Sequence, residues 1–283
     1  MANAIVTLRH VAELRERVSQ WRKAGERIGL VPTMGALHDG HLRLVRRALI
    51  DCPRVIVTLF VNPRQFSASE DLSNYPRDES ADHDLLAPLK VELLFAPTLE
   101  EIYPPGFATT VTVSDLSKNL CGPHRPGHFA GVTTIVAKLL LQAQPDAAYF
   151  GEKDFQQLQI IRRLVRDLDV PVEIVGVPTV RDDDGLALSS RNRYLSPAER
   201  VAATALPRTL EAIARRLKAS PDGVAPALAW GRTELTRAGF AKIDYIEVCD
   251  ADTLQPASSA SSNARVFAAA WIGRTRLIDN MPI

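Results

Sequence analysis

The sequence has almost no excess charge and few cysteines. Its 34 Lys and Arg residues are balanced by 33 Asp and Glu residues, so the formal net charge is +1. Such a chain has no global field that attracts nucleic acid or an anionic membrane, and any anion must be bound locally. The three cysteines, Cys52, Cys121 and Cys249, lie far apart and form no Cys-x-x-Cys pair. We therefore expect reduced, buried thiols.

The sequence also lacks a long apolar run. No stretch approaches the ~18 apolar residues of a membrane-spanning helix. Residues 8–17 carry charges where a signal peptide requires an uninterrupted apolar run. We therefore expect a soluble, cytoplasmic protein with no membrane or nucleic-acid partner. With 283 residues, 46% of them hydrophobic, the chain can bury a sizeable core in one large domain or in a main domain and a smaller one.

Short apolar runs alternate with amphipathic stretches over residues 28–177, a pattern typical of strand–helix–strand units with a parallel sheet. Strands are predicted at residues 28–33, 54–61, 91–96, 147–150 and 172–177, and helices at 42–50, 131–142 and 155–168. This layout predicts an α/β domain with a Rossmann-like parallel sheet.

The pattern changes after Arg181. Residues 182–185 signal a turn, and Ser196 followed by Pro197 marks a helix start, with serine as N-cap and proline at the first helical position. Ala- and Arg-rich helical stretches follow, and strands are predicted at residues 243–248, 266–271 and 274–278. We predict two domains: a Rossmann-like domain over residues 1–181 and a smaller α+β domain over residues 182–283.

The first candidate site segment is residues 32–41, between the first predicted strand and its helix. Ligands of open parallel sheets bind at the carboxyl ends of strands, and a helix N-terminus there offers unpaired N–H groups to a phosphate. Gly35 and Gly40 allow close backbone approach, while His38 and His41 can direct imidazole donors at one anion. The alternatives are a surface turn with incidental histidines or a zinc site, but no third metal ligand is nearby, and we predict no protein-bound metal.

Polar side chains also follow the second predicted strand. Asn62 and Gln65 carry neutral amides, which suit a polyol or a carboxylate that must be oriented without being neutralised. The alternative is a plain turn, because Asn-Pro after a strand is commonly just that.

A third segment lies where residues 147–150 pass into the next helix. Gly151 permits close backbone approach, Lys153 can place a charge on a phosphate, and Asp154 can accept hydrogen bonds from ribose hydroxyls or cap the helix. Gln157 falls on the same helical face as Asp154. The alternative is an ordinary capped helix with solvated charges.

The fourth segment is residues 186–192, where Ser189 and Ser190 precede Arg191. Two hydroxyls and a guanidinium can bind a triphosphate as a mobile loop, with Arg191 stabilising charge on the leaving pyrophosphate. The alternative is a polar hinge between domains. Three of the four segments lie at predicted strand ends and the fourth where a lid would begin, which favours a common cleft.

In this order, the four segments closely resemble those of the pantothenate synthetase family. Residues 74–77, 127–132 and 274–280 are also similar to segments of that family. The resemblance implies a Rossmann-like nucleotide-binding domain related to the His-x-Gly-His nucleotidyltransferases, a C-terminal lid domain and a homodimer. One departure is Leu188, where the family commonly has methionine; the two side chains are similar in volume, so we expect little effect.

The resemblance implies that ATP, Mg²⁺, pantoate and β-alanine react through a pantoyl adenylate to give pantothenate, AMP and pyrophosphate. It implies that His41 is the main catalytic histidine, with His38, Lys153 and Arg191 stabilising charge. It implies that Gln65 and Gln157 hold pantoate, with Gln65 also near β-alanine, and we add Asn62 as a substrate-binding candidate. The implied ATP site comprises Met34, Gly35, Ala36, Leu37, His38, Asp39, Gly40, His41, Gly151, Glu152, Lys153, Asp154, Val180, Leu188, Ser189, Ser190 and Arg191.

Three other functions compete with this interpretation. A nucleotidylyltransferase of the same superfamily would retain the nucleotide in its product, but its usual shorter chains lack the Asn-Pro-x-Gln segment. An RNA-binding or aminoacyl-tRNA-synthetase-like module is disfavoured by the near-neutral charge. A purely structural or interaction protein would not bind ATP.

Overall fold

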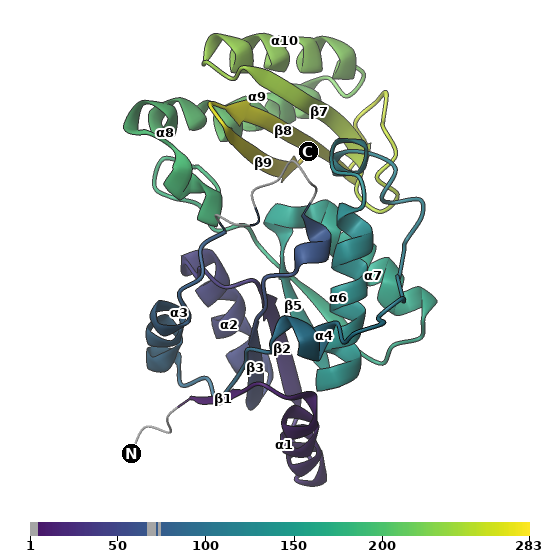
Figure 1. Ribbon diagram of the computed structural model, residues 1–283. Helices are drawn as coiled ribbons and strands as arrows, with labels where there is room; N and C mark the ends of the chain where they lie inside the picture. The colour runs from purple at the N-terminus through teal and green to yellow at the C-terminus, as the bar shows by residue number, and fades with distance from the viewer. Residues whose placement is uncertain (1–4, 67–71, 73–74) are drawn as a thin grey trace. The chain divides into compact units, whose positions relative to one another are not determined.

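The computed structural model describes residues 5–66, 72 and 75–283 of the chain (Figure 1). Asn74, in one of the family-like segments, lies outside the described residues. The chain divides into two compact units. Unit 1 comprises Met1–Ser114, Arg125–Glu152 and Ile160–Pro178, and unit 2 comprises Asp115–His124, Lys153–Gln159 and Thr179–Ile283. The single boundary predicted between residues 181 and 182 stays a prediction.

Unit 1 contains a six-stranded parallel sheet in the order β1-β4-β3-β2-β5-β6. The strands are β1 (Val6–Leu8), β2 (Ile28–Thr33), β3 (Arg54–Leu59), β4 (Leu93–Phe95), β5 (Ala147–Gly151) and β6 (Glu173–Val177). The α/β fold class predicted from the sequence is confirmed. The bounds of β2 are those predicted, whereas β1 was not predicted.

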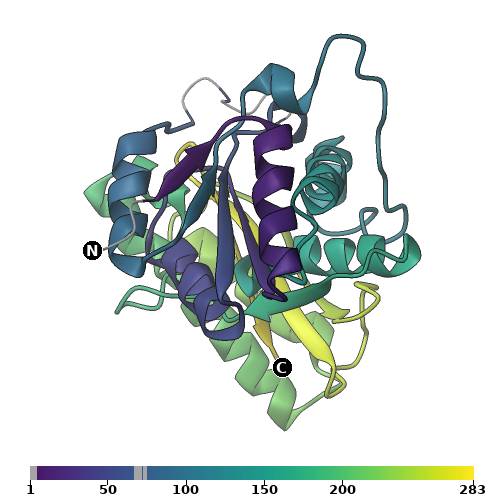
Figure 2. The ribbon, with the colours of Figure 1, turned by 90° about the horizontal axis from the view of Figure 1, so that it is seen from below.

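Helices cover both faces of this sheet. Figure 2 shows α1 (Val11–Lys23) and α6 (His128–Ala143) on one face and α2 (Asp39–Asp51) on the other. The α2 side chains Leu44, Val45 and Ala48 are buried in a common apolar cluster with residues of β2, β3, β4 and β5. Each fully buried Val or Leu contributes roughly 1.5–3 kcal/mol, so this packing fixes α2 firmly at the carboxyl end of β2.

The remaining helices of the chain are α3 (Glu79–Leu86), α4 (Leu99–Ile102), α5 (Cys121–His124), α7 (Phe155–Asp167), α8 (Pro197–Ala203), α9 (Ala205–Ala219) and α10 (Val224–Arg237). The helices predicted at residues 42–50, 131–142 and 155–168 correspond to α2, α6 and α7. Helices α1, α3, α4 and α5 were not predicted from the sequence. No described helix is long and apolar enough to cross a membrane.

Unit 2 is built on a three-stranded antiparallel sheet of β7 (Lys242–Asp250), β8 (Ala264–Ile272) and β9 (Thr275–Pro282). Helices α9 and α10 pack against each other and against this sheet (Figure 1). The smaller C-terminal α+β unit expected from the sequence is therefore present. Cys52, Cys121 and Cys249 are free and buried, as expected.

Helix α8 begins with the capping arrangement that the sequence predicts. The Ser196 hydroxyl accepts a hydrogen bond from the Glu199 N–H at 3.3 Å, and the Ser196 N–H donates to the Glu199 carboxylate at 2.8 Å. These bonds hold the pKa of Glu199 below its usual value. Two helix N–H groups that would otherwise lack partners are thereby satisfied.

We predict that Ser196→Ala lowers the free energy of unfolding by about 0.5–2 kcal/mol, the usual cost of losing a serine N-cap. The measurement is urea unfolding followed by circular dichroism. Ser258→Ala is the control, because it makes the same chemical change at an exposed loop position. Equal unfolding midpoints for the two variants would contradict the assignment of the cap.

Candidate active site

Three of the predicted site segments follow neighbouring strands of the unit 1 sheet. Strand β2 pairs in parallel with β3 on one side and with β5 on the other. The carboxyl ends of parallel strands meet at one edge of a sheet, and the crevice beside a reversal of strand order is the usual ligand site. The loops after β2 and β3 are in direct contact, because the Gln65 Nε2 lies 2.9 Å from the Met34 Sδ.

The two histidines lie side by side at the start of α2. His38 is the N-cap, and its Nδ1 accepts a hydrogen bond from the Gly40 N–H at 3.2 Å. The centroids of the His38 and His41 rings are 4.1 Å apart. Because the Nδ1 of His38 is an acceptor, its ring proton resides on Nε2.

Backbone N–H groups of this segment were expected to be free for a phosphate, and for most of them this expectation is wrong. The Gly40 N–H donates to the His38 ring, and the His41 N–H donates to the His38 carbonyl at 2.8 Å. The N–H groups of Ala36 and Leu37 donate to Asp82. Most backbone N–H groups of the segment therefore already have acceptors within the protein.

Asp82 is a residue that sequence reasoning missed. It lies in α3, is 3% exposed, and accepts hydrogen bonds from the Ala36 N–H at 2.9 Å and the Leu37 N–H at 2.7 Å. Gly35 and Ala36 both have left-handed φ values, of 81° and 52°. A Cβ on Gly35 would lie 2.9 Å from the Asp82 carboxylate. The carboxylate thus holds a turn that residue 35 can form only without a side chain.

One sequence signal could have found Asp82. It precedes Leu86 by four residues, so the two share one face of α3, and Leu86 is fully buried. An acidic residue on the buried face of a short amphipathic helix requires hydrogen-bond partners, which points to a supporting role.

Asn62 is buried and bonded to the protein on every side of its amide. It is 1% exposed, and its Nδ2 donates to the Gln65 Oε1 and to the Gly131 carbonyl, both at 3.1 Å. Its Oδ1 accepts from the Arg64 N–H at 3.3 Å and from the Tyr103 hydroxyl at 2.8 Å. Burial raises the pKa of Tyr103 to about 12, so this hydroxyl keeps its proton. In this structure Asn62 orients Gln65, and its predicted contact with a substrate stays a prediction.

The backbone of Gln65 is fixed against α6. The Arg125 guanidinium lies 2.8 Å from the His128 Nε2, and because arginine only donates, the ring proton of His128 is on Nδ1. That Nδ1–H donates to the Gln65 carbonyl at 2.8 Å. A Cβ on Gly131 would lie 2.2 Å from the Arg64 carbonyl oxygen. Only glycine allows α6 to approach the Gln65 turn this closely.

The remaining predicted residues of unit 1 lie at the end of β5. Gly151 is the last residue of β5, and Glu152 follows it. The loop after β5 therefore starts from the same edge of the sheet as the loops that carry His38 and Gln65.

Unit 2 carries the other predicted site residues in two segments. The first begins with Lys153, whose Nζ lies 3.8 Å from the Asp154 carboxylate, and continues into α7 with the half-buried Gln157. The second is a hairpin in which the Leu188 N–H donates to the Val180 carbonyl at 2.9 Å.

The hairpin leads directly into the serine-arginine segment. Ser189 caps the 3₁₀ turn Ser190–Tyr194 and accepts a hydrogen bond from the Arg191 N–H at 3.3 Å. Val180, Leu188 and Arg191 are therefore parts of one local structure.

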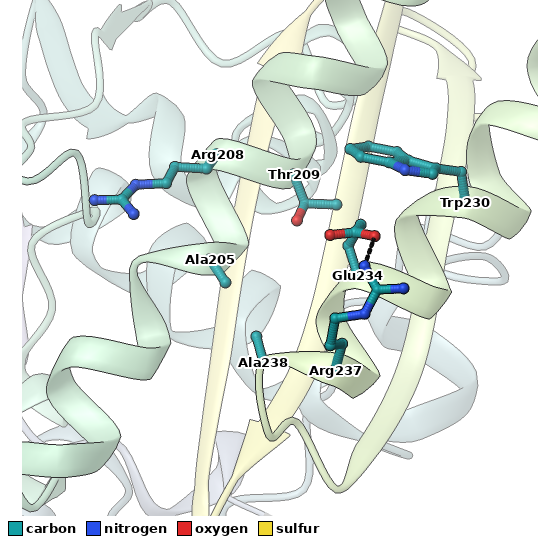
Figure 3. Close-up of a pocket in the computed structure, with 7 residues that line it drawn as sticks. All are labelled: Ala205, Arg208, Thr209, Trp230, Glu234, Arg237 and Ala238. Carbon is teal, nitrogen blue, oxygen red and sulfur yellow. Dashed lines mark hydrogen bonds and ion pairs between the residues drawn. The ribbon is translucent and has the colours of Figure 1, made fainter.

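A pocket in unit 2 holds none of these residues. It has a volume of about 290 Å³ and is lined by Ala205, Arg208, Thr209, Trp230, Glu234, Arg237 and Ala238, on α9, α10 and the residue after α10 (Figure 3). Arg237 is paired with Glu234 at 2.6 Å. The pocket therefore forms no part of the predicted site.

Among the described residues, no three His, Cys, Asp or Glu side chains are grouped so that they could hold a metal ion. The buried Asp82 carboxylate contacts the histidine segment, and each of its two oxygens accepts a hydrogen bond from a backbone N–H group.

Known proteins match this chain over its whole length. The family model for pantoate-beta-alanine ligase matches residues 6–282. The pantothenate synthetase of Chelativorans sp. (strain BNC1) is 54% identical over 280 residues, covering 99% of this chain and 98% of that protein. The pantothenate synthetase of Paramagnetospirillum magneticum is 53% identical over 283 residues, covering 100% and 99%.

Solved structures give the same result. The crystal structure of pantothenate synthetase from Thermus thermophilus has a TM-score of 0.92 and 48% identity, covering 98% of this chain and 99% of that chain. Pantoate-beta-alanine ligase from Francisella tularensis, solved in complex with beta-gamma ATP and beta-alanine, has a TM-score of 0.84 and 34% identity, covering 99% and 98%.

We predict that Asp82→Asn lowers the free energy of unfolding by about 1–3 kcal/mol, because an amide group faces two N–H donors and leaves one of them unsatisfied. Hydrogen exchange of the Ala36 and Leu37 amides should also become faster. The control is Asp78→Asn in the same segment, where the side chain caps α3 through the Ala81 N–H and asparagine caps equally well. Equal exchange at Ala36 and Leu37 in the two variants would refute the role of Asp82.

Proposed function

The chain belongs to the pantoate-beta-alanine ligase family, and from this membership we propose how its residues catalyse the ATP-dependent condensation of pantoate with β-alanine. The family match over residues 6–282 is the observation that carries the function. The histidine segment and the Gln65 turn both belong to unit 1 and are in contact. This contact supports the assignment of both segments to one site.

The chemistry requires activation of a carboxylate, which is a poor electrophile because oxide is a poor leaving group. In-line attack of a pantoate carboxylate oxygen on the α-phosphorus of ATP forms pantoyl adenylate and releases pyrophosphate. The neutral amine of β-alanine then attacks the acyl carbon, and AMP leaves with the bonding electrons. Both steps need orientation of reactants and stabilisation of developing negative charge rather than a protein nucleophile.

His38 and His41 are proposed to stabilise charge on the phosphates. The Nε2–H of His38 donates to a phosphate oxygen, and His41 carries the larger catalytic role beside it. The closeness of the two rings, whose centroids lie 4.1 Å apart, supports a common target. Lys153 and Arg191 add positive charge, with Arg191 acting on the leaving pyrophosphate. Mg²⁺ accompanying ATP would neutralise part of the phosphate charge.

Gln65 and Gln157 are proposed to hold pantoate through neutral amides, and Gln65 also lies near the bound β-alanine. This role is supported by the hydrogen bonds that fix Gln65, which come from Asn62, itself bonded to Tyr103, and from His128. These buried polar groups hold one amide in place before a substrate binds. A neutral amide orients the pantoate carboxylate without lowering its nucleophilicity through a fixed charge.

The remaining nucleotide contacts are proposed at Met34, Gly35, Ala36, Leu37, Asp39, Gly40, Gly151, Glu152, Asp154, Val180, Leu188, Ser189 and Ser190. Val180 contacts adenine through its backbone, and the turn that begins at Ser190 binds phosphates. We further propose that the protein is a cytoplasmic homodimer and that the C-terminal unit shields the adenylate from water.

His41→Ala is expected to lower kcat by about 10²–10³, the usual cost of losing one preorganised donor. The thermal unfolding midpoint should stay close to that of the wild type, because the ring lies in a site rather than in a core. His83→Ala, which removes an exposed imidazole from the same unit, is the control and should keep full turnover. Wild-type turnover in the His41→Ala variant would contradict the proposed catalytic role of His41.

The reaction itself is tested by isotope exchange. In the absence of β-alanine, labelled pyrophosphate should enter ATP only when pantoate is present, because adenylate formation is reversible. Adding β-alanine should then release one AMP for each pantothenate formed. A nucleotide retained in the product, or exchange that does not depend on pantoate, would point to a nucleotidylyltransferase instead.

A further inference from the structure

The family-like segment at residues 274–280 has no role in the function proposed above. It forms β9, whose Asp279 and Asn280 are polar but only 3% and 4% exposed. Buried polar side chains are retained only when they make hydrogen bonds, so their partners indicate what they do.

We propose that Asp279 and Asn280 are positioning residues that hold the two nucleotide-binding segments of unit 2 in their working geometry. This inference rests on the proposed function, since it assigns support for Lys153, Val180 and Arg191. All the residues involved belong to unit 2.

Asn280 fixes the backbone of Lys153. Its Nδ2 donates to the Lys153 carbonyl at 2.9 Å, and its Oδ1 accepts from the Arg265 guanidinium at 2.6 Å. The same guanidinium lies 4.1 Å from the centroid of the Phe155 ring. The chain is therefore held on both sides of Asp154, and the stem of Lys153 starts from a fixed point.

Asp279 fixes the hairpin that carries the second segment. Its carboxylate accepts hydrogen bonds from both terminal nitrogens of the Arg181 guanidinium, at 2.7 and 2.9 Å, and its side chain is 1% exposed. Arg181 also donates to the Gly185 carbonyl at 3.0 Å and forms a bridge with Ala187. Val180 and Leu188 flank this bridge, so the ion pair sets the base from which the residues up to Arg191 extend.

Adjacent residues reach different segments because successive side chains of a strand point to opposite faces of its sheet. Strand β9 thereby connects the Lys153 segment with the Val180 hairpin. Neither of its two residues is proposed to contact the phosphates. A misplacement of about 1 Å in a catalytic group can cost on the order of 10² in rate, so such support is expected to appear in the kinetics.

The main test is Asn280→Asp in the full-length protein. The introduced carboxylate preserves shape and keeps the contact with Arg265, but it faces the Lys153 carbonyl with an acceptor in place of a donor. We expect kcat/KM for ATP to fall about tenfold, with KM for pantoate unchanged. Lowering the pH protonates the new carboxyl group and restores a donor, so the ratio of variant to wild-type kcat/KM for ATP should rise as the pH falls.

The matched control is Gln159→Glu. Gln159 is also buried, and its Nε2 donates to the Ala251 carbonyl at 2.9 Å, so the substitution makes the same change against a carbonyl outside the nucleotide segments. This variant should lose stability but keep the wild-type kcat/KM for ATP at every pH.

A second pair of variants tests Asp279. Asp279→Asn weakens the pair with Arg181, whereas Asp244→Asn makes the same change at another buried aspartate of this sheet, which pairs with Arg276 at 2.7 Å. Both should lower the unfolding midpoint, but only Asp279→Asn should raise KM for ATP. Should Asn280→Asp fail to fold, Asn280→Ala removes the donor without adding charge and is measured in the same way.

The outcomes separate this inference from the proposed function. A wild-type protein that does not condense pantoate with β-alanine refutes the function. An active wild type whose Asn280→Asp and Asp279→Asn variants match their controls in ATP kinetics overturns the positioning role alone. A selective ATP defect with recovery of Asn280→Asp at low pH supports it.

Discussion

The parallel pairing of β2 with β3 and β5 is the constraint on which the placement of the candidate site residues of unit 1 depends. The register places Thr33 opposite Leu59, so both strands end at the same level and their loops leave from one edge. The His38 turn and the Gln65 turn then meet without any long connection. Packing of α2 on the sheet fixes the position of the helix whose first residues carry the imidazoles. The positions of the two histidines thus depend on the burial of apolar side chains between α2 and the sheet.

Buried polar residues add the precision that the sheet alone does not supply. Asp82, Asn62 and His128 direct their hydrogen bonds at the backbone or side chains of site loops rather than at solvent. Asp279 and Asn280 do the same in unit 2. A buried polar group costs about 1–3 kcal/mol when it lacks a partner, so each of these residues penalises any loop conformation other than the one observed.

The sequence predicted what depends on local patterns and missed what depends on distant partners. The bounds of β2, the α8 cap and the positions of His38 and Gln65 after strands follow from apolar runs and turn residues. The role of Asp82 depends on partners 45 and 46 residues away, and no spacing rule reveals them. The expectation of free N–H groups before α2 was wrong at Ala36 and Leu37 for the same reason, because a side chain from α3 accepts from both. At Gly40 it was wrong for a local reason, since the N-cap histidine accepts from that N–H.

The satisfied backbone has a chemical consequence for the two histidines. Protonating both rings would place two like charges 4.1 Å apart, which is unfavourable even where solvent screens them. Protonating the Nδ1 of His38 would in addition set a proton against the Gly40 N–H. The hydrogen bond from the Gly40 N–H therefore requires His38 to carry its ring proton on Nε2. The same hydrogen bond that caps α2 thus fixes the tautomer of one of two neighbouring histidines.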